Sequence, residues 1–322
     1  MLDTIKKPIN DHLKRFEPYF REHMSTQVSL LNVITNYIFR RKGKQLRPMI
    51  VFLTAGVNGK IGDETYVAAG MIELLHTATL IHDDVVDEAY ERRGFFSINA
   101  LWRSKIAVLV GDYLLSRGLL VAIDNNQFEL LKVMSKAVKD MSEGELLQIE
   151  RSRKMNIDEA TYYEIIQKKT ASLIASCCAN GAISAGASEE NITRMKEFGL
   201  NLGIAFQIRD DLFDYQPSGV IGKPTGNDIK EKKLTLPLIH SLSVANPTES
   251  KRILSLIRNN SKKSSTIDEV VNFVKRNGGL DYTIQQMNSF KDKSLDILKL
   301  FPESEYRDSL EQLVNFVVER NK

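Results

Sequence analysis

Three aspartates stand close together in the stretch LIHDDVVDEAYERRG, which runs from Leu80 to Gly94. On a helix, residues four apart share one face, so Asp83 and Asp87 would present two carboxylates on the same side, with Asp84 beside them. Two neighbouring carboxylates repel each other unless a cation compensates their charge. The spacing therefore indicates either a solvated acidic surface or a site for a metal ion.

The same pattern returns in FQIRDDLFDY, where Asp210, Asp211 and Asp214 have the same relative spacing. A single motif of this kind usually belongs to a solvated face. Two copies embedded in apolar sequence indicate carboxylates at the edge of a core, where like charges need compensation. Hard cations with oxygen ligands supply it, and Mg²⁺ is expected where carboxylates and substrate phosphates share the coordination shell. The two motifs together therefore predict a diphosphate substrate.

Basic residues that could bind such a substrate occur in several short motifs. Arginine binds phosphate oxygens in bidentate fashion and lysine adds a point charge, although each such residue taken singly is more often a surface cation. The candidates are Lys44 and Arg47 in GKQLRP, Arg92 and Arg93 after the first aspartates, Lys169 in QKKT, Lys223 in GKPTGND and Lys233 in EKKLT.

The segments that must carry these residues have helical patterns. Asp63 is expected to cap a long helix that leads into the first aspartates, because apolar residues recur at helical spacing after it. Thr266 and Glu269 have the spacing of a capping box, and the NGG at 277–279 is expected to end the helix that follows. Two more helices close the chain, and earlier ones are expected at about 104–123, 128–151, 158–185 and 189–214.

These patterns predict an all-α fold, a bundle of long helices around a central active-site cavity. No sustained period-2 alternation interrupts the helical patterns, and no linker rich in proline, glycine or serine divides them. Small residues, as in ASCCANGAISAGA, permit close helix packing. The whole chain, residues 1–322, is therefore predicted to be a single domain.

The composition is that of an ordinary globular protein and excludes some classes of function. Of the 322 residues 43% are hydrophobic and 26% charged, and the net charge of +3 is too balanced to indicate a nucleic-acid partner. Cys177 and Cys178 are adjacent and give no disulfide framework, which suits a reducing compartment. We find no signal peptide and expect no transmembrane span, so a cytoplasmic location is predicted.

Taken together, the motifs resemble those of the trans-polyprenyl diphosphate synthases, and in particular long-chain synthases of the octaprenyl and heptaprenyl type. The resemblance covers nearly the whole chain and preserves the family's order of motifs. It rests on GKQLRP, ELLHTATLIHDDVVDEAYERRG, GDYLL, EGELLQ, KTASL, FQIRDDLFDY and GKPTGNDIKEKKLTLPLI.

The resemblance implies an activity, a metal and two substrates. Members of this family condense isopentenyl diphosphate with an allylic diphosphate, here of the farnesyl or geranylgeranyl type. Mg²⁺ bridges the allylic diphosphate and both aspartate motifs, with three ions expected when substrate is bound. Ionisation of the allylic C–O bond allows the isopentenyl double bond to attack the cation, and an apolar cavity keeps water away.

The resemblance also implies roles for individual residues. Asp83, Asp87 and Asp210 are the expected metal ligands, and Asp84, Asp211 and Asp214 support them. The isopentenyl diphosphate site is expected at Lys44, Arg47, His76 and Arg93, and the allylic diphosphate site at Arg92, Lys169, Thr170, Gln207, Lys223 and Lys233. The other histidines are interpreted as structural, namely His12, His23, His82 and His240.

A few positions depart from the family's usual pattern. Lys42 and Gln45 stand where glycine and arginine are common, Phe96 replaces a usual proline, and Lys232 replaces a common glycine before Lys233. None of these changes removes a metal ligand, so they bear on loop geometry and affinity.

Product length is expected to depend on the residues just before the first aspartate motif. In the family their side chains line the floor of the elongation tunnel. Here Ala78 and Thr79 are small, and Leu75 lies one turn deeper. An open floor predicts a long all-trans product of the kind used for quinone side chains.

Three other interpretations fit parts of the sequence. A class I terpene cyclase shares the fold and the first motif, but its second metal motif normally mixes Asn, Ser or Thr and Glu, whereas this chain repeats DDxxD. A non-catalytic subunit would not need two complete aspartate motifs. A catalytic subunit of a heteromeric synthase remains open beside the homodimer that we expect, and sequence does not identify the interface.

Overall fold

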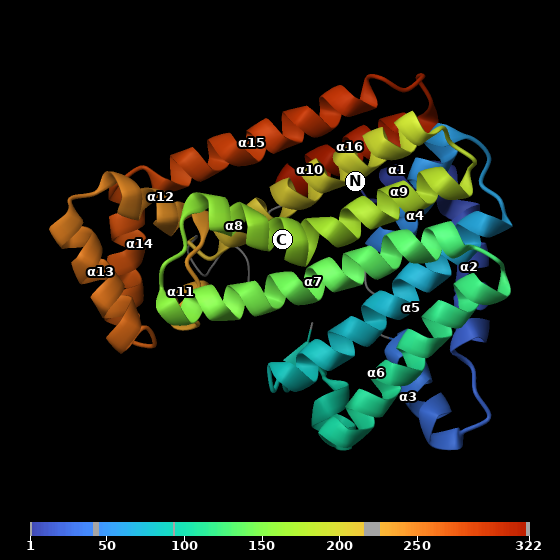
Figure 1. Ribbon diagram of the computed structural model, residues 1–322, viewed down its shortest axis with the longest axis horizontal. Helices are drawn as coiled ribbons and strands as arrows, with labels where there is room; N and C mark the ends of the chain where they lie inside the picture. Colours follow the sequence, from blue (N-terminus) through green and yellow to red (C-terminus); the bar gives the residue numbers. More distant parts are fainter. Residues whose placement is uncertain (1, 41–44, 93, 216–225, 320–322) are drawn as a thin grey trace. The chain divides into compact units, whose positions relative to one another are not determined.

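The computed structural model describes residues 2–40, 45–92, 94–215 and 226–319. Almost all of this part of the chain is helical, so the predicted all-α class is confirmed (Figure 1). The only strands in the described ranges, β1 (Glu91–Arg92) and β2 (Phe95–Phe96), form a short antiparallel hairpin in which Arg92 pairs with Phe95.

The helices follow one another with short connections. The N-terminal half contains α1 (Leu2–Lys6), the 3₁₀-helix η1 (Lys7–Ile9), α2 (Asn10–Met24), α3 (Ser29–Arg40), α4 (Leu46–Asn58), α5 (Asp63–Val86), α6 (Ile98–Asp124) and α7 (Phe128–Lys154). The C-terminal half contains α8 (Glu159–Ile166), the π-helix η2 (Gln167–Ala171), α9 (Ser172–Ser184), α10 (Glu189–Phe213), α11 (Asn227–Lys230), α12 (Leu236–Val244), α13 (Pro247–Asn260), α14 (Ser264–Arg276), α15 (Gly279–Leu298) and α16 (Glu305–Glu319).

The chain forms two compact units that are interleaved in sequence. The first contains Met1–Ser135, Ser176–Met195 and Phe301–Leu310, and the second contains Lys136–Ala175, Lys196–Leu300 and Glu311–Lys322. Four of the five boundaries fall inside α7, α9, α10 and α16, and the fifth falls between α15 and α16, so neither unit is a continuous stretch of chain. The single domain predicted from sequence stays a prediction.

In the first unit, α5 lies along α6, and glycines on α6 allow the close approach (Figure 1). A Cβ atom at Gly111 would lie 2.2 Å from His82 Nε2, and one at Gly118 would lie 2.9 Å from Leu75 Cδ2. On α9, a Cβ atom at Gly181 would lie 1.9 Å from Thr54 Oγ1 of α4. The predicted close packing of the small-residue helix is therefore confirmed.

In the second unit, the apolar faces of α8, α10, α12, α14 and α15 enclose a core. Ile204, Ile208 and Leu212 recur on the buried face of α10, the same helix that carries the second aspartate motif. Because these side chains are almost fully buried, the helix has little freedom to rotate or slide. The aspartates that follow them are held at the edge of this core.

Helix ends differ in detail from the expectation. α5 begins at Asp63, but its N-cap is Gly62, whose N–H donates to Thr65 Oγ1 over 3.3 Å. The capping box predicted at Thr266 and Glu269 is wrong, because α14 already begins two residues earlier, which places Thr266 inside the helix as a buried residue. The predicted stop at NGG is confirmed, since Gly278 adopts φ +70°.

Two irregularities interrupt the helices that carry or adjoin the predicted site residues. α6 has a break at Arg103, where φ is 68° and ψ is 162°, which explains why its regular apolar pattern starts at about residue 104. The helix expected over 158–185 contains the π-helical turn η2, Gln167–Ala171. Such turns are rare and frequently occur at functional sites.

Candidate active site

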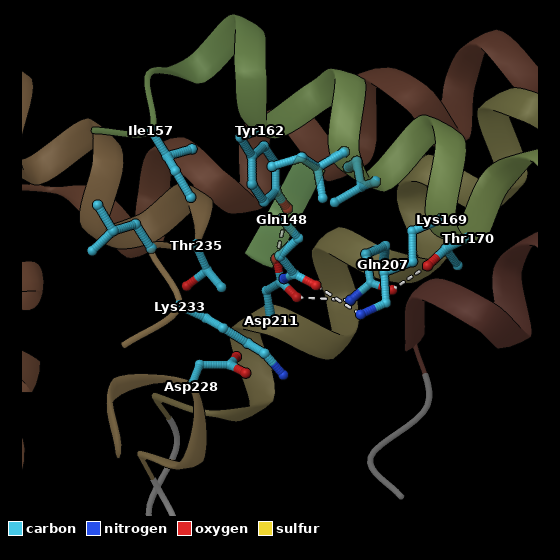
Figure 2. A pocket seen from close by; sticks show the side chains of 13 residues that line it. Gln148, Ile157, Tyr162, Lys169, Thr170, Gln207, Asp211, Asp228, Lys233 and Thr235 are labelled. Carbon is cyan, nitrogen blue, oxygen red and sulfur yellow. Dashed lines mark hydrogen bonds between the residues drawn. The ribbon is translucent and has the colours of Figure 1, made fainter. Parts of the chain in front are cut away.

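The second aspartate motif lies at the end of α10, and its middle carboxylate is buried. Asp211 is 5% exposed. Tyr162 Oη donates to Asp211 Oδ2 over 2.7 Å, and Gln207 Nε2 donates to Oδ1 over 2.8 Å. Each oxygen of this carboxylate therefore has a donor from a neighbouring side chain, as Figure 2 shows.

The third carboxylate of the motif holds the segment that follows. Asp214 Oδ1 accepts from Asn227 N over 2.7 Å, and Oδ2 accepts from Asp228 N over 3.0 Å. These bonds fix the start of α11 beside α10. Asp228, which the sequence reasoning did not single out, is thereby brought next to the second motif. Its place at the end of GKPTGND, five residues after the predicted Lys223, was the available signal.

Burial and neighbouring charge both raise the pKa values of this cluster. Burial, together with the negative charge of Asp228, raises the pKa of Asp211 to about 8. Burial and the charge of Asp214 raise the pKa of Asp228 to about 6. Burial also raises the pKa of Asp214 above its ordinary value. The shifts show a cluster that is short of positive charge.

A small cavity of about 100 Å³ opens beside this cluster in the second unit. It brings together five residues predicted from sequence, and it adds polar residues that were not predicted. The predicted residues are Lys169, Thr170, Gln207, Asp211 and Lys233, and the additional polar ones are Gln148, Tyr162, Asp228 and Thr235. Figure 2 shows these side chains gathered from α7, α8, η2, α10 and the segment around α11.

The π-helical turn places Lys169 and Thr170 on the wall of the cavity. Two glycines let neighbouring helices approach this turn closely. A Cβ atom at Gly144 of α7 would lie 2.8 Å from Lys169 N, and one at Gly203 of α10 would lie 2.5 Å from Ala171 Cα. Because real Cβ atoms do not approach so closely, larger residues at either position would displace the turn.

The lysines of the cavity are paired with glutamates. Lys169 Nζ lies 2.5 Å from Glu145 Oε2 and donates to Gln148 Oε1 over 2.7 Å. Lys233 Nζ lies 2.5 Å from Glu231 Oε2. These pairs are partly exposed, so each contributes little to stability, and a phosphate could take the place of the glutamate. The preceding residue, Lys232, has φ +59°, which explains why a glycine would suit that position.

The first aspartate motif ends α5 in the first unit. Asp83 and Asp87 are exposed, whereas Asp84 is buried and only 5% exposed. Asp87 is the C-cap, and its N–H donates to Asp83 O over 2.8 Å, so the two exposed carboxylates keep the four-residue helical spacing. The predicted pair on one side of a helix is confirmed, and its role as a metal site stays a prediction.

Of the predicted isopentenyl diphosphate residues, the described part of the chain contains Arg47 in α4 and His76 in α5. Arg47 Nε lies 3.2 Å from Glu73 Oε2, and His76 is buried one helical turn after Glu73. Gln45, the N-cap of α4, has φ 52° in the left-handed region. Lys44, Arg93 and Lys223 lie outside the described residues, and of Arg92 only the backbone in β1 is described.

The carboxylates fit a divalent cation by their chemistry. Their donors are all oxygens, and the raised pKa values show that positive charge is needed beside them. In the described part of the chain, no group of three or more acidic, histidine or cysteine side chains forms a complete metal site by itself. A cation held by one or two carboxylates would be completed by substrate phosphate oxygens and water, as Mg²⁺ sites commonly are.

The helical fold and the paired acidic and basic residues define a class, the all-α enzymes that act on diphosphates. Comparison with known proteins places the chain within that class. The family model described as Polyprenyl synthetase matches residues 28–274. The octaprenyl diphosphate synthase of Escherichia coli (strain K12) is 35% identical over 302 residues, which is 94% of this chain and 93% of that one. The chain therefore belongs to the polyprenyl synthetase family and is a prenyltransferase.

Two further comparisons bear on substrate and product. The solved polyprenyl synthase of Caulobacter crescentus CB15, complexed with calcium and isoprenyl diphosphate, superposes with a TM-score of 0.90 at 32% identity, covering 100% of this chain and 98% of that one. A short chain isoprenyl diphosphate synthase of Methanothermobacter thermautotrophicus is 32% identical over 97% of this chain and 98% of that one. Similarity alone therefore does not distinguish short from long products.

The close approach at Gly203 generates a prediction. Gly203→Ala should displace the π-helical turn, because its new methyl group would meet Ala171 Cα. We expect a loss of stability of about 1–3 kcal/mol and weaker use of an allylic diphosphate. Urea denaturation and the KM for farnesyl diphosphate measure the two effects.

Lys196→Ala, at an exposed position of the same helix, serves as the control and should change neither quantity. A Gly203→Ala protein with wild-type stability and wild-type KM would contradict the tight packing of the turn.

Proposed function

We propose that the protein is a Mg²⁺-dependent synthase that condenses isopentenyl diphosphate with an allylic diphosphate of the farnesyl or geranylgeranyl type. The product would be a long all-trans polyprenyl diphosphate for quinone side chains. The observation that carries this proposal is the cavity in which Lys169, Gln207 and Lys233 surround the carboxylates of Asp211 and Asp228. It offers cationic and amide donors for phosphate oxygens beside carboxylates that need a cation.

The reaction breaks one bond and forms another. The C–O bond of the allylic diphosphate breaks, and its electron pair leaves with the diphosphate. The double bond of isopentenyl diphosphate attacks the allylic carbon and forms the new C–C bond. A proton is then lost from the carbon next to the new cation, which restores a double bond, and the released diphosphate accepts that proton.

The residues support this reaction by binding and charge. Lys169 and Lys233 would bind the allylic diphosphate in place of Glu145 and Glu231, and Gln207 and Thr170 would add neutral contacts. Bound Mg²⁺, with three ions expected, would neutralise the leaving diphosphate. Asp83, Asp87 and Asp210 are proposed as its ligands, supported by Asp84, Asp211 and Asp214. Lys44, Arg47, His76 and Arg93 are proposed for isopentenyl diphosphate, and Arg92 and Lys223 for the allylic diphosphate.

The names of the relatives support the proposal. The Escherichia coli relative is an octaprenyl diphosphate synthase, and the Caulobacter crescentus structure holds calcium and an isoprenyl diphosphate. The family assignment also favours a prenyl synthase over a terpene cyclase. A catalytic subunit of a heteromeric synthase remains the second candidate.

The deciding experiment is a Mg²⁺-dependent assay of the purified chain with labelled isopentenyl diphosphate and farnesyl diphosphate. We expect long linear products whose formation stops when the metal is chelated. Asp83→Ala and Asp210→Ala should each lower the rate by about 10²- to 10³-fold or more, because each removes charge that stabilises the leaving diphosphate.

Asp296→Ala, which removes an exposed carboxylate of α15, is the control and should retain the wild-type rate. A folded wild-type chain that incorporates no label would contradict self-sufficient synthesis and favour a missing partner or a non-catalytic role.

The proposed length of the product depends on α5. Leu75 and Ala78 are each 1% exposed, and Thr79 is partly buried. Leu75 and His82 contact α6 at Gly118 and Gly111, and Ala78 and Thr79 lie between them along the same stripe of α5. The small side chains of Ala78 and Thr79 are the basis of the proposal of a long product.

Ala78→Phe tests this directly. A ring at this position should block chain growth, so we expect a shorter product while the first condensation continues. Sizing of the dephosphorylated products by chromatography gives the length, and the rate of the first addition to farnesyl diphosphate serves as the internal control for folding. An unchanged length would place the floor elsewhere.

We further propose that the protein is a homodimer formed through α6. This helix is the one in the described chain that is long and apolar enough by composition to cross a membrane, yet the core helix of a globular protein passes the same test. One of its faces packs on α5. The other leaves Leu109 57%, Leu120 42% and Ile123 43% exposed, at spacings that place them on one stripe. A partner copy would cover this stripe.

Leu109→Glu should weaken such a dimer, because it places a charge in the apolar stripe. Light scattering after size-exclusion chromatography should give a dimer for the wild type and the 36.5 kDa monomer for the variant. Leu300→Glu, which changes a leucine of similar exposure outside α6, is the matched control. A wild type that elutes as a monomer would contradict the proposal.

We propose a cytoplasmic location for the protein. Cys177 and Cys178 are free and buried, which suits a reducing compartment.

A further inference from the structure

Tyr162 is a buried polar residue that the reaction as described above does not use. It belongs to α8 and is 3% exposed. Its hydroxyl donates to Asp211 Oδ2 over 2.7 Å, in a part of the core where an unsatisfied hydroxyl would be costly. The bond joins α8 to the end of α10, next to the cavity.

Asp211 is in turn hydrogen-bonded to Gln207, and Gln207 is hydrogen-bonded to Thr170. Gln207 Nε2 donates to Asp211 Oδ1 over 2.8 Å, and Gln207 Oε1 accepts from Thr170 Oγ1 over 2.8 Å. Both oxygens of Asp211 accept hydrogen bonds here, so the NH₂ end of the Gln207 amide faces the carboxyl group. The opposite end of that amide then receives the Thr170 proton. Figure 2 shows these bonds as one connected series.

The hydrogen bonds from Tyr162 and Gln207 also distinguish Asp211 from the other aspartates of the motif as a possible metal ligand. A cation bound directly to Asp211 would compete with the Tyr162 hydroxyl and the Gln207 amide for the two oxygens. Asp211 is 5% exposed, so access from solvent is limited as well. Its geometry suits the orientation of side chains better than the binding of an ion.

We propose that Tyr162 and Asp211 are positioning residues that hold the Gln207 amide and the Thr170 hydroxyl in one arrangement for the allylic diphosphate. This inference rests on the proposed function, since it assigns the cavity to that substrate. It goes further by giving Asp211 an orienting role in place of a supporting role in metal binding. It also adds Tyr162, which the motifs did not indicate.

The adjacent tyrosine provides a matched control. Tyr163 lies on the same helix and its ring packs against Phe290 and against the Tyr162 ring, but it is not among the cavity-lining residues and its hydroxyl contacts Gln286 over 3.4 Å. Tyr162→Phe and Tyr163→Phe each remove a single hydroxyl oxygen from a partly or fully buried ring. Only the first removes a donor to Asp211.

The test compares binding, kinetics and stability of these variants. In Tyr162→Phe we expect the KM for farnesyl diphosphate to rise about tenfold, with the KM for isopentenyl diphosphate unchanged, because the hydrogen bond that holds Asp211 in place is lost. Calorimetry with unreactive farnesyl thiodiphosphate and Mg²⁺ should show the same loss of affinity. Tyr163→Phe should match the wild type in the KM for farnesyl diphosphate and in the affinity for the thiodiphosphate. Urea denaturation measures the stability of each protein.

A second set of variants separates orientation from metal binding. Asn in place of Asp211 can still accept from Gln207 through its oxygen, so Asp211→Asn should restore much of the allylic affinity that Asp211→Ala loses. The Mg²⁺ concentration for half-maximal rate should stay near the wild-type value in Asp211→Asn and rise about tenfold or more in Asp210→Asn. This arm also applies if Tyr162→Phe does not fold.

The outcomes are distinct. Wild-type affinity in Tyr162→Phe, or equal losses in the two tyrosine variants, would overturn the inference while leaving the proposed function intact. A requirement for more Mg²⁺ in Asp211→Asn, as large as in Asp210→Asn, would return Asp211 to the metal site. A wild type that incorporates no isopentenyl diphosphate would overturn the proposed function itself.

Discussion

The burial of like charges at the end of α10 is the constraint on which the site depends. Burial removes the water that would otherwise solvate Asp211, Asp214 and Asp228 and raises their pKa values, and the charges of Asp228 and Asp214 add to the shifts of Asp211 and Asp228, respectively. Isolated charges of this kind would destabilise the fold, so donors must surround them. Tyr162, Gln207 and the backbone N–H groups at the start of α11 supply those donors.

The donors determine how the surrounding elements are arranged. The hydrogen bond from Tyr162 to Asp211 joins α8 to α10. The bonds from the backbone N–H groups of Asn227 and Asp228 to Asp214 join the segment that carries Lys233 to the same end of α10. The backbone N–H of Lys233 in turn donates to Asp228 O over 2.8 Å. The lysine that could bind a phosphate is thus held beside the carboxylates that need a cation, and the same bonds serve both stability and binding.

Close backbone packing places the remaining side chains. The π-helical turn that presents Lys169 and Thr170 lies between glycines on α7 and α10, where no Cβ atom would fit. In the first unit, glycines of α6 and α9 allow an equally close approach to α5 and α4. Catalytic geometry of this kind depends on shape as much as on charge, because a turn displaced by a methyl group would move the lysine it carries.

The sequence by itself determined the fold class and predicted the chemistry of the site. Helical periodicity predicted the long helices and most of their limits, and the two DDxxD motifs with their basic neighbours indicated a metal and a diphosphate. The repeat of a charge pattern within apolar sequence is a local property, so it can be recognised without knowing which segments meet. The predicted residues Lys169, Thr170, Gln207, Asp211 and Lys233 do lie around one cavity.

The tertiary structure alone decided which neighbours these residues have. Tyr162 and Asp228 line the cavity together with the predicted residues, and the helix through Lys169 contains a π-helical turn. Asp211 is buried, and both of its oxygens accept hydrogen bonds. Each of these facts arises from contacts between segments far apart in the chain, such as α8 with α10. Local propensity and spacing carry no information about such contacts, because burial and hydrogen bonding are settled only when the helices pack.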